Sequence, residues 1–187
     1  MGRPKALLPW RGLPFVEHVC SSLRASGVED RVVVLGRASA EILSFWKPSG
    51  EKVAVNPRPQ DGQIASLRVG LDCADRNAEA FFVCLVDQPT ISLETYKKII
   101  SAWLADKESI VIPRFLRPGR RTDEPPYKRG HPIIIPAARR HLCFEGPLDK
   151  GLHWVTHHPS VKVMDLVVED AGIIRDFDTP EQYEQLK

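Results

Sequence analysis

The sequence is poor in cysteine, and it has neither a long apolar run nor an excess of charge of one sign. No two cysteines form a C-x-x-C pair, and most of them lie within apolar stretches. Such scattered cysteines argue against a zinc site or a disulfide framework. They are typical of a reduced protein, so we expect a cytoplasmic location. The four residues are Cys20, Cys73, Cys84 and Cys143.

The absence of long apolar runs and of a charge excess narrows the class of partner. No apolar stretch approaches the roughly 20 residues that a membrane-spanning helix needs. The 26 Lys and Arg residues nearly balance the 24 Asp and Glu residues, which gives a net charge of +2. We therefore expect neither a nucleic acid nor a membrane as partner. The 187 residues fit a single domain, residues 1–187, with a sizeable core.

Helical and strand patterns alternate along the chain. Helical spacing of apolar residues begins at Phe15, Ser39, Ile64, Ser92, Ala137, Asp149 and Pro180, with Ser39 and Ser92 as predicted caps. Runs typical of strands occupy residues 31–35, 52–56, 81–86, 109–113, 131–136 and 161–168. This alternation predicts one α/β domain in which helices cover both faces of a mostly parallel sheet.

The stretch from Phe81 to Pro89 is central to the functional prediction. Six consecutive apolar residues, rich in aromatic and β-branched types, predict a strand buried on both faces. Asp87 follows directly, and the carboxyl ends of strands are where open α/β sheets bind ligands. A carboxylate there suits Mg²⁺ held against nucleotide phosphates. The alternative is an ordinary turn, in which Asp and Pro are also common.

Two further stretches are candidates for contact with a nucleotide. Gly2 to Lys5 could cradle a phosphate, with Lys5 as the point charge. In Asn56 to Ser66 a predicted strand ends in Asn-Pro, and a loop with Gly62 leads to Gln63 and Ser66 at a helix start, where negative charge is favoured. A solvated lysine and a turn with capping residues are the structural alternatives.

Two stretches in the second half of the chain are candidates for an acceptor site and a metal site. Gly130-His131-Pro132 follows an arginine-rich segment, and His131 could contact a phosphorylated or pterin-like substrate. Asp176 and Asp178 flank Phe177, so in an extended segment both carboxylates project to one face. One of them could complete a metal site with Asp87, although Asp at a helix start is also a good cap.

These motifs occur together in one order that resembles the MobA-like nucleotidyltransferases, and within them the MocA branch of molybdenum cofactor cytidylyltransferases. Each motif is short, but five in sequence are a strong joint signal, and the resemblance covers essentially the whole chain. The motifs are Met1-Gly2-x-x-Lys5, Asn56-Pro57 with Gly62-Gln63-x-x-Ser66, Asp87-Gln88-Pro89, Gly130-His131-Pro132 and Asp176-Phe177-Asp178-Thr179-Pro180.

The resemblance implies a three-layer Rossmann-like fold of the nucleotide-diphospho-sugar-transferase type. It also implies transfer of CMP from CTP to the phosphate of molybdopterin, with release of pyrophosphate and with Mg²⁺ as cofactor. The implied partners are CTP or another NTP, molybdopterin, and a molybdenum hydroxylase or its chaperone. Alternatives are a relative that transfers GMP, one that acts on a small phosphorylated metabolite, and a non-catalytic protein that binds the cofactor.

By the same resemblance, Lys5 and Asp87 are the catalytic residues. Asp87 would ligate Mg²⁺ together with Asp176 or Asp178. Gly2, Lys5, Asn56, Gly62, Gln63 and Ser66 would bind the nucleotide, and Gly130, His131 and Pro132 would face the acceptor. In the family a strand and a glycine loop precede the first of these motifs. We therefore expect a longer native protein, whose additional strand lies in the middle of the sheet.

Overall fold

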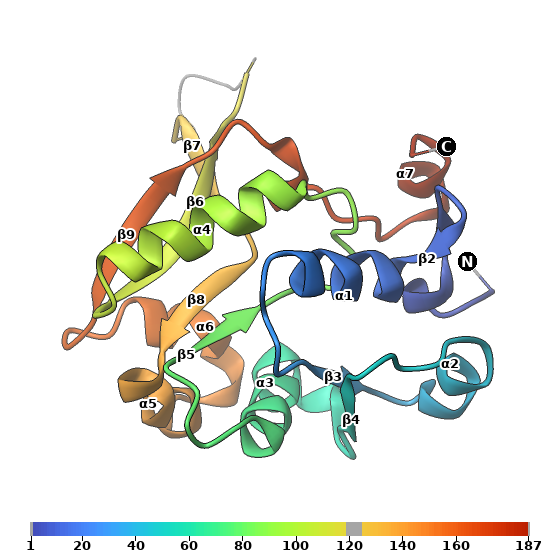
Figure 1. The fold of residues 1–187 in the computed structure, drawn as a ribbon, viewed down its shortest axis with the longest axis horizontal. Coiled ribbons are helices and arrows are strands. Elements are labelled where there is room, and N and C mark those ends of the chain that lie inside the picture. The colour runs from blue at the N-terminus through green and yellow to red at the C-terminus, as the bar shows by residue number, and fades with distance from the viewer. Residues whose placement is uncertain (1, 119–124, 187) are drawn as a thin grey trace.

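The computed structural model describes residues 2–118 and 125–186 (Figure 1). The strands are β1 (Pro9–Trp10), β2 (Leu13–Pro14), β3 (Val32–Leu35), β4 (Lys52–Val55), β5 (Ala80–Val83), β6 (Ser109–Leu116), β7 (Tyr127–Arg129), β8 (Ile133–Pro136) and β9 (Lys162–Val167). The α-helices are α1 (Phe15–Ala25), α2 (Ser39–Phe45), α3 (Gln63–Cys73), α4 (Leu93–Ala105), α5 (Arg140–Glu145), α6 (Gly151–Thr156) and α7 (Pro180–Glu184). Short 3-10 turns are η1 (Lys5–Leu7), η2 (Pro59–Asp61), η3 (Ala137–Arg139), η4 (Leu148–Lys150) and η5 (Ala171–Ile174).

The strand directions confirm the predicted α/β class with a mostly parallel sheet. β3 pairs with β4 in parallel, and β6 pairs with β9 in parallel. β8 lies between β5 and β6 and is antiparallel to both, so β5, β6 and β9 run in one direction. β7 is a short antiparallel strand on the edge of β6.

Alternating residues of β6 show why helices cover both faces of the sheet. Ile110 and Ile112 pack in the cluster that contains residues of α3, α5 and α6. Val111 points the other way and packs with Ile99 and Trp103 of α4. Successive strand residues face opposite sides of a sheet, so this run must bury both faces. The three-layer arrangement predicted from the sequence is therefore present.

The sheet is divided between β3 and β5. Within the described chain β3 is hydrogen-bonded only to β4 and β5 only to β8, and the two units form separate sheets. A cavity of about 750 Å³ lies between them, lined by β3, β5, α1 and α3. Val33 and Phe82 are among its strand residues, and Asp87 and Ser66 are also in its wall. The free edges of both strands therefore face an empty space in the middle of the fold.

This division also explains why the predicted central strand is shorter and less buried than expected. β5 ends at Val83, and Asp87 lies in a turn beyond it. Phe81 and Phe82 are only partly buried, because they border the cavity. The prediction of a strand buried on both faces through Val86 was wrong in these two respects.

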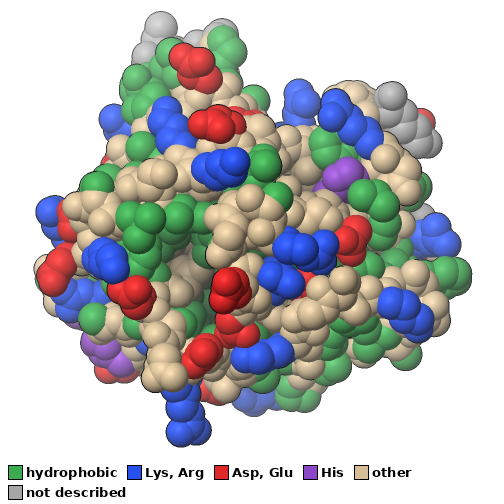
Figure 2. All heavy atoms as spheres, in the orientation of Figure 1, with side chains coloured by type: hydrophobic (Ala, Val, Ile, Leu, Met, Phe, Trp, Pro, Cys, Tyr) green, Lys and Arg blue, Asp and Glu red, His purple; other side chains and the backbone are tan. Residues whose placement is uncertain are grey.

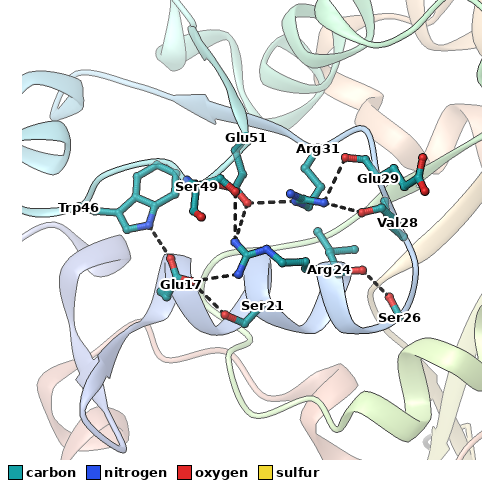
Figure 3. Close-up of polar contacts among 11 residues, drawn as sticks. Glu17, Ser21, Arg24, Ser26, Val28, Glu29, Arg31, Trp46, Ser49 and Glu51 are labelled. Atoms are coloured by element: carbon teal, nitrogen blue, oxygen red, sulfur yellow. Dashed lines mark hydrogen bonds and ion pairs between the residues drawn. The ribbon is translucent and has the colours of Figure 1, made fainter.

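Polar contacts fasten α1 to the β3–β4 unit (Figure 3). The Glu51 side chain is fully buried and accepts hydrogen bonds from Arg24 and Arg31, each at 3.0 Å. Trp46 donates its indole N–H to Glu17 of α1 at 2.9 Å. Because β3 and β4 are not joined to the rest of the sheet by hydrogen bonds, these contacts and the surrounding apolar packing hold them in place.

Other predicted features are confirmed or corrected at single residues. Ser92 caps α4 by accepting the N–H of Thr95, as predicted. Ser39 lies inside α2 and forms no cap. The hairpin β1–β2 was not predicted, since each strand has only two residues. Of the arginine-rich segment, Arg120 and Arg121 lie outside the described residues.

The surface agrees with the balanced charge of the sequence. On the face shown in Figure 2, acidic and basic side chains are interspersed. Among the described residues, no helix has both the length and the apolar character required to cross a membrane.

Candidate active site

Lys5 lies between two carboxylates that are far away in the sequence. Its Nζ donates a hydrogen bond to Oδ1 of Asp178 and lies 3.7 Å from Oδ2 of Asp87. All three side chains remain partly exposed, so they are accessible to a ligand. The structure thus brings together three of the residues that the sequence predicted as one site.

Three local structures place these side chains. Lys5 begins η1, whose other two residues, Ala6 and Leu7, are buried. Asp87 follows β5, and its backbone carbonyl accepts the N–H of Phe177 at 3.3 Å. Phe177 is 2% exposed and packs against Phe15 of α1, with 5.9 Å between ring centroids. The buried Phe177 ring therefore fixes the segment that carries Asp178 beside Asp87.

The electrostatics of this site favour a bound cation. Burial raises the pKa of the Asp87 carboxyl above its usual value, and the nearby Asp176 and Asp178 raise it further, against the opposite effect of Lys5. The charged groups that act on Asp87 are thus the carboxylates of Asp176 and Asp178 and the ammonium group of Lys5. A divalent cation beside these three carboxylates would favour their charged forms.

The donor set fits Mg²⁺ together with a nucleotide. In residues 2–118 and 125–186, no group of three or more His, Cys, Asp or Glu side chains is arranged to hold a metal ion. Mg²⁺, however, is commonly held by one or two carboxylates and by substrate phosphates. Asp87 and Asp178, which both lie near Lys5, would be such a pair of hard oxygen ligands. The residues present therefore fit a metal that arrives with the nucleotide.

Asp176 has a different partner from Asp178. Its Oδ1 accepts a hydrogen bond of 2.7 Å from Nε2 of Gln88, a side chain that is 3% exposed. Gln88 was part of the quoted Asp-Gln-Pro motif but was assigned no role from the sequence. The only sequence signal for a role of Gln88 was its position directly after Asp87, the candidate metal ligand.

The predicted nucleotide-binding stretch lies at one end of the cavity. Gln63 and Ser66, at the start of α3, line the cavity with Asp87. Gly62 precedes α3 with φ +87°, and no side chain in the described part of the chain caps this helix. The first N–H groups of α3 are therefore suited to bind an anion.

Asn56 is held by the protein itself. It is 4% exposed, donates to Ser66 Oγ at 3.0 Å, and accepts the N–H of Arg58 at 2.9 Å. These bonds join the end of β4 to α3. Its predicted contact with a nucleotide stays a prediction, as do those of Gly2 and Gly62.

The Gly130-His131-Pro132 stretch packs against η5. A Cβ on Gly130 would lie 1.9 Å from the carbonyl oxygen of Ile173, so close packing requires glycine here. Pro132 is fully buried, so its side chain offers no surface to an acceptor, contrary to the expectation. His131 Nε2 has no partner within the described chain. Burial lowers the pKa of His131, although Asp176 opposes this effect, which favours the neutral imidazole.

Described members of the arginine-rich segment have internal contacts. Arg129 forms a two-bond ion pair with Asp165 of β9, at 2.6 and 2.8 Å. The Arg114 guanidinium lies 4.5 Å from the centre of the Tyr127 ring. The first contact joins β7 to β9 and the second joins β6 to β7. Both agree with the structural interpretation of the individual arginines.

A comparison with known families identifies the group to which this site belongs. Residues 1–160 match the family described as "MobA-like NTP transferase domain". The chain belongs to that family. The match includes Lys5, Asp87 and the Gly130-His131-Pro132 stretch, and it supports an enzyme that transfers nucleotidyl groups.

Individual relatives of this MobA-like chain are distant in sequence and near in structure. It is 30% identical over 147 residues to nicotine blue oxidoreductase of Paenarthrobacter nicotinovorans, a match that covers 75% of the chain and 66% of that protein. The structure of Rv0371c from Mycobacterium tuberculosis H37Rv matches with a TM-score of 0.84 and 25% identity, over 100% of this chain and 90% of that one.

Two further solved structures share the fold. Rv0371c in complex with manganese matches with a TM-score of 0.79 and 27% identity, over 99% of this chain and 92% of that one. A nucleotidyl transferase from Methanothermobacter thermautotroptrophicus matches with a TM-score of 0.74 and 18% identity, over 97% of this chain and 82% of that one. At 18% identity the likeness indicates the fold alone. These structures confirm the expected nucleotidyltransferase fold.

Proposed function

We propose that this MobA-like protein transfers CMP from CTP to the phosphate of molybdopterin and releases pyrophosphate. The observation that carries the proposal is the position of Lys5 between the carboxylates of Asp87 and Asp178. A cation and two cation ligands at the end of a strand suit the phosphates of an NTP and the metal that accompanies them. The choice of CTP and of molybdopterin rests on the resemblance to the MocA branch.

Each residue of the site would have a distinct role. Lys5 would leave the carboxylates and neutralise the NTP phosphates, and Asp87 with Asp178 or Asp176 would hold Mg²⁺. When bound, Mg²⁺ supplies positive charge that stabilises the developing negative charge of phosphoryl transfer. The manganese in the Rv0371c complex supports a divalent metal in this fold.

The reaction needs little covalent chemistry from the protein. An oxygen of the acceptor phosphate attacks the α-phosphorus of CTP, a new P–O bond forms, and the bond to the β-phosphate oxygen breaks. The acceptor is already an anion at neutral pH, so no strong general base is required. Positioning and charge stabilisation therefore provide most of the catalysis.

The substrates would lie on opposite sides of Asp87. Gly2, Asn56, Gly62, Gln63 and Ser66 are the proposed nucleotide contacts, and the start of α3 would receive negative charge. Gly130 would support the acceptor side through its backbone, and the neutral His131 would contact the acceptor. The protein would act in the cytoplasm and deliver its product to a molybdenum hydroxylase or its chaperone.

We also propose that an extended strand from outside residues 1–187 fills the cavity between β3 and β5. The support is the pair of unpaired strand edges, because buried backbone N–H and C=O groups are costly without partners. A synthetic apolar peptide added to the chain should raise its melting temperature. A peptide of equal length with alternating charges should not, and equal effects of both would contradict the proposal.

The first experiment is calorimetric titration with CTP, GTP and ATP, each with Mg²⁺. We expect CTP to bind most tightly. Replacing Asp87 with Asn should weaken that metal-dependent binding about tenfold or more, because the metal loses a charged ligand. The matched control is Asp149→Asn. This change removes an exposed carboxylate of η4 that is far from the site residues in sequence, and the variant should bind CTP like the parent.

Other outcomes of this titration identify the alternatives. A preference for GTP would indicate guanylyl transfer. Molybdopterin binding that is unchanged by Asp87→Asn, without nucleotide binding, would indicate a non-catalytic cofactor-binding protein. The relative from Paenarthrobacter nicotinovorans is named as an oxidoreductase. Binding of reduced nicotinamide dinucleotide in place of NTPs would therefore favour redox chemistry.

A further inference from the structure

Two carboxylates separated by a single residue have different environments at the edge of the candidate site. Asp178 meets Lys5, and its side chain is 55% exposed. Asp176 instead accepts the Gln88 amide at 2.7 Å. The sequence treats the two as equivalent candidates for the metal, whereas the structure separates them.

The orientation of the Gln88 amide is determined by its surroundings. Its Nε2 donates to Asp176 Oδ1 and also to the carbonyl oxygen of Ile173 at 3.2 Å. Both partners are acceptors, so the amide cannot flip without placing its own oxygen against them. The His131 backbone N–H donates to the same Ile173 oxygen at 3.1 Å. The Gln88 side chain is thus locked in a buried position as a donor to Asp176.

Asp178 is oriented separately, on the far side of the buried Phe177. Its backbone N–H and that of Thr179 both donate to Oε1 of Gln182, at 2.8 and 3.0 Å. These bonds fix the backbone at the start of α7 and leave the Asp178 carboxylate available to Lys5 and to the solvent. The two carboxylates of this segment therefore have separate constraints.

We propose that Gln88 is a positioning residue that holds Asp176 out of the cation site, so that Asp87 and Asp178 are the carboxylates that meet the metal. The proposal rests on the proposed function only in requiring a divalent cation at Asp87. Gln88 itself contacts neither the metal nor a substrate. It acts by donating a hydrogen bond to the carboxylate of Asp176, which would otherwise compete for the metal.

The first test compares single variants by direct Mn²⁺ binding, measured as free Mn²⁺ by electron paramagnetic resonance. Asp178→Asn should weaken Mn²⁺ binding about tenfold or more, as expected when a metal ligand, or a residue that holds a ligand in place, is lost. Asp176→Asn is the matched variant two residues away, and we expect a change of no more than about threefold. An equal or larger loss in Asp176→Asn would overturn the proposal.

The decisive test is a rescue. In the Asp178→Asn background, Gln88→Met keeps the side-chain bulk but removes the donor and releases Asp176. We expect Mn²⁺ affinity to recover at least about threefold, since a freed carboxylate can supply a missing ligand. Adding Asp176→Asn as a third change should abolish the recovery. A purely structural role of Gln88 predicts a further loss instead, and that result would overturn the proposal.

Two controls keep this test independent of the proposed function and of folding. If Asp87→Asn leaves Mn²⁺ binding unchanged, the metal site itself is wrong, and the proposal about Gln88 is overturned with it. If Asp87→Asn weakens Mn²⁺ binding but Asp176→Asn and Asp178→Asn weaken it equally, only the proposal about Gln88 is overturned. Thermal unfolding of each variant shows whether it is folded, and the pair Asp176→Asn and Asp178→Asn remains decisive if Gln88→Met unfolds.

Discussion

Gly130 illustrates how a single residue can join two parts of this fold. Its N–H donates to the Pro113 carbonyl at 2.9 Å, and its Cα faces the backbone of Ile173. The family resemblance implied that this glycine faces the acceptor. In the structure its close neighbour is the chain itself, at Ile173. The candidate acceptor loop therefore depends on packing that no side chain could replace.

Replacing Gly130 with Ala should destabilise the protein strongly. The added methyl group would lie 1.9 Å from the Ile173 oxygen, so the backbone of β8 or η5 must shift. We expect a loss of about 3 kcal/mol or more in the free energy of unfolding, measured by urea denaturation. Gly36→Ala is the control, since its Cβ would meet only Pro59, at 3.4 Å. A loss equal to that of Gly36→Ala would contradict the packing argument.

Glu51 should make the stability of the protein sensitive to acid. Burial alone would raise its pKa, but hydrogen bonds from Arg31, Ser49 and Arg24 outweigh that effect and hold the pKa below its usual value of 4.5. A carboxyl with a lowered folded-state pKa stabilises the fold above its unfolded-state pKa. That stabilisation is lost as the pH falls through the folded-state pKa.

The corresponding measurement is urea denaturation of Glu51→Gln at pH 7 and below pH 4.5. At pH 7 we expect a loss of about 3 kcal/mol, because Arg31 is left buried without its counter-charge. The variant should also lose less stability than the parent when the pH falls below 4.5. Glu41→Gln, at an exposed position of α2, is the control. Parallel pH profiles of Glu51→Gln and the parent would contradict the assignment.

Among the elements, α4 and β5 show what sequence patterns can and cannot predict. α4 was predicted with its cap, because Ser92 and the apolar spacing after it are local signals. β5 was predicted too long, since Cys84 to Val86 are apolar but, among the residues that the structure describes, have no neighbouring strand to pair with on the side of the cavity. The β1–β2 hairpin was missed because each of its strands has only two residues. The contact between Gln88 and Asp176 joins residues distant in sequence, so no local pattern indicated it.

Removing the cap of α4 tests the element directly. Ser92→Ala should lower the free energy of unfolding by about 1 kcal/mol, because the Thr95 N–H loses its side-chain acceptor. Ser101→Ala removes the same hydroxyl from an exposed position in the middle of α4 and should be close to neutral. Thermal unfolding of the two variants would compare them, and equal effects would argue against the cap.

For the whole molecule, the main feature is a sheet in two parts. The family resemblance led us to expect an additional strand in the middle of the sheet, and the cavity lies between β3 and β5. Which residues form the candidate site was largely predictable, because Lys5, Asp87 and Asp178 each belong to a recognisable sequence motif. The distances between these three side chains could not be predicted from the sequence, because they depend on the packing of Phe177 against α1.

The two parts of the sheet should differ in hydrogen exchange. Peptides that cover β6 and β8 should exchange about tenfold more slowly than those that cover β3, because β6 and β8 are paired on both sides. Mass spectrometry of deuterium uptake measures this difference. Uniform protection of β3 and β6 would show that the open edge of β3 is covered in solution.

The open edges of β3 and β5 also have a consequence for how copies of the chain behave together. An unpaired strand edge is a template on which a strand of another molecule can form hydrogen bonds. Many proteins prevent this with charged or proline residues, but β3 contains only Val32, Val33, Val34 and Leu35. Self-association of this chain should therefore begin at these edges, and whatever fills the cavity would also act as its protection against aggregation.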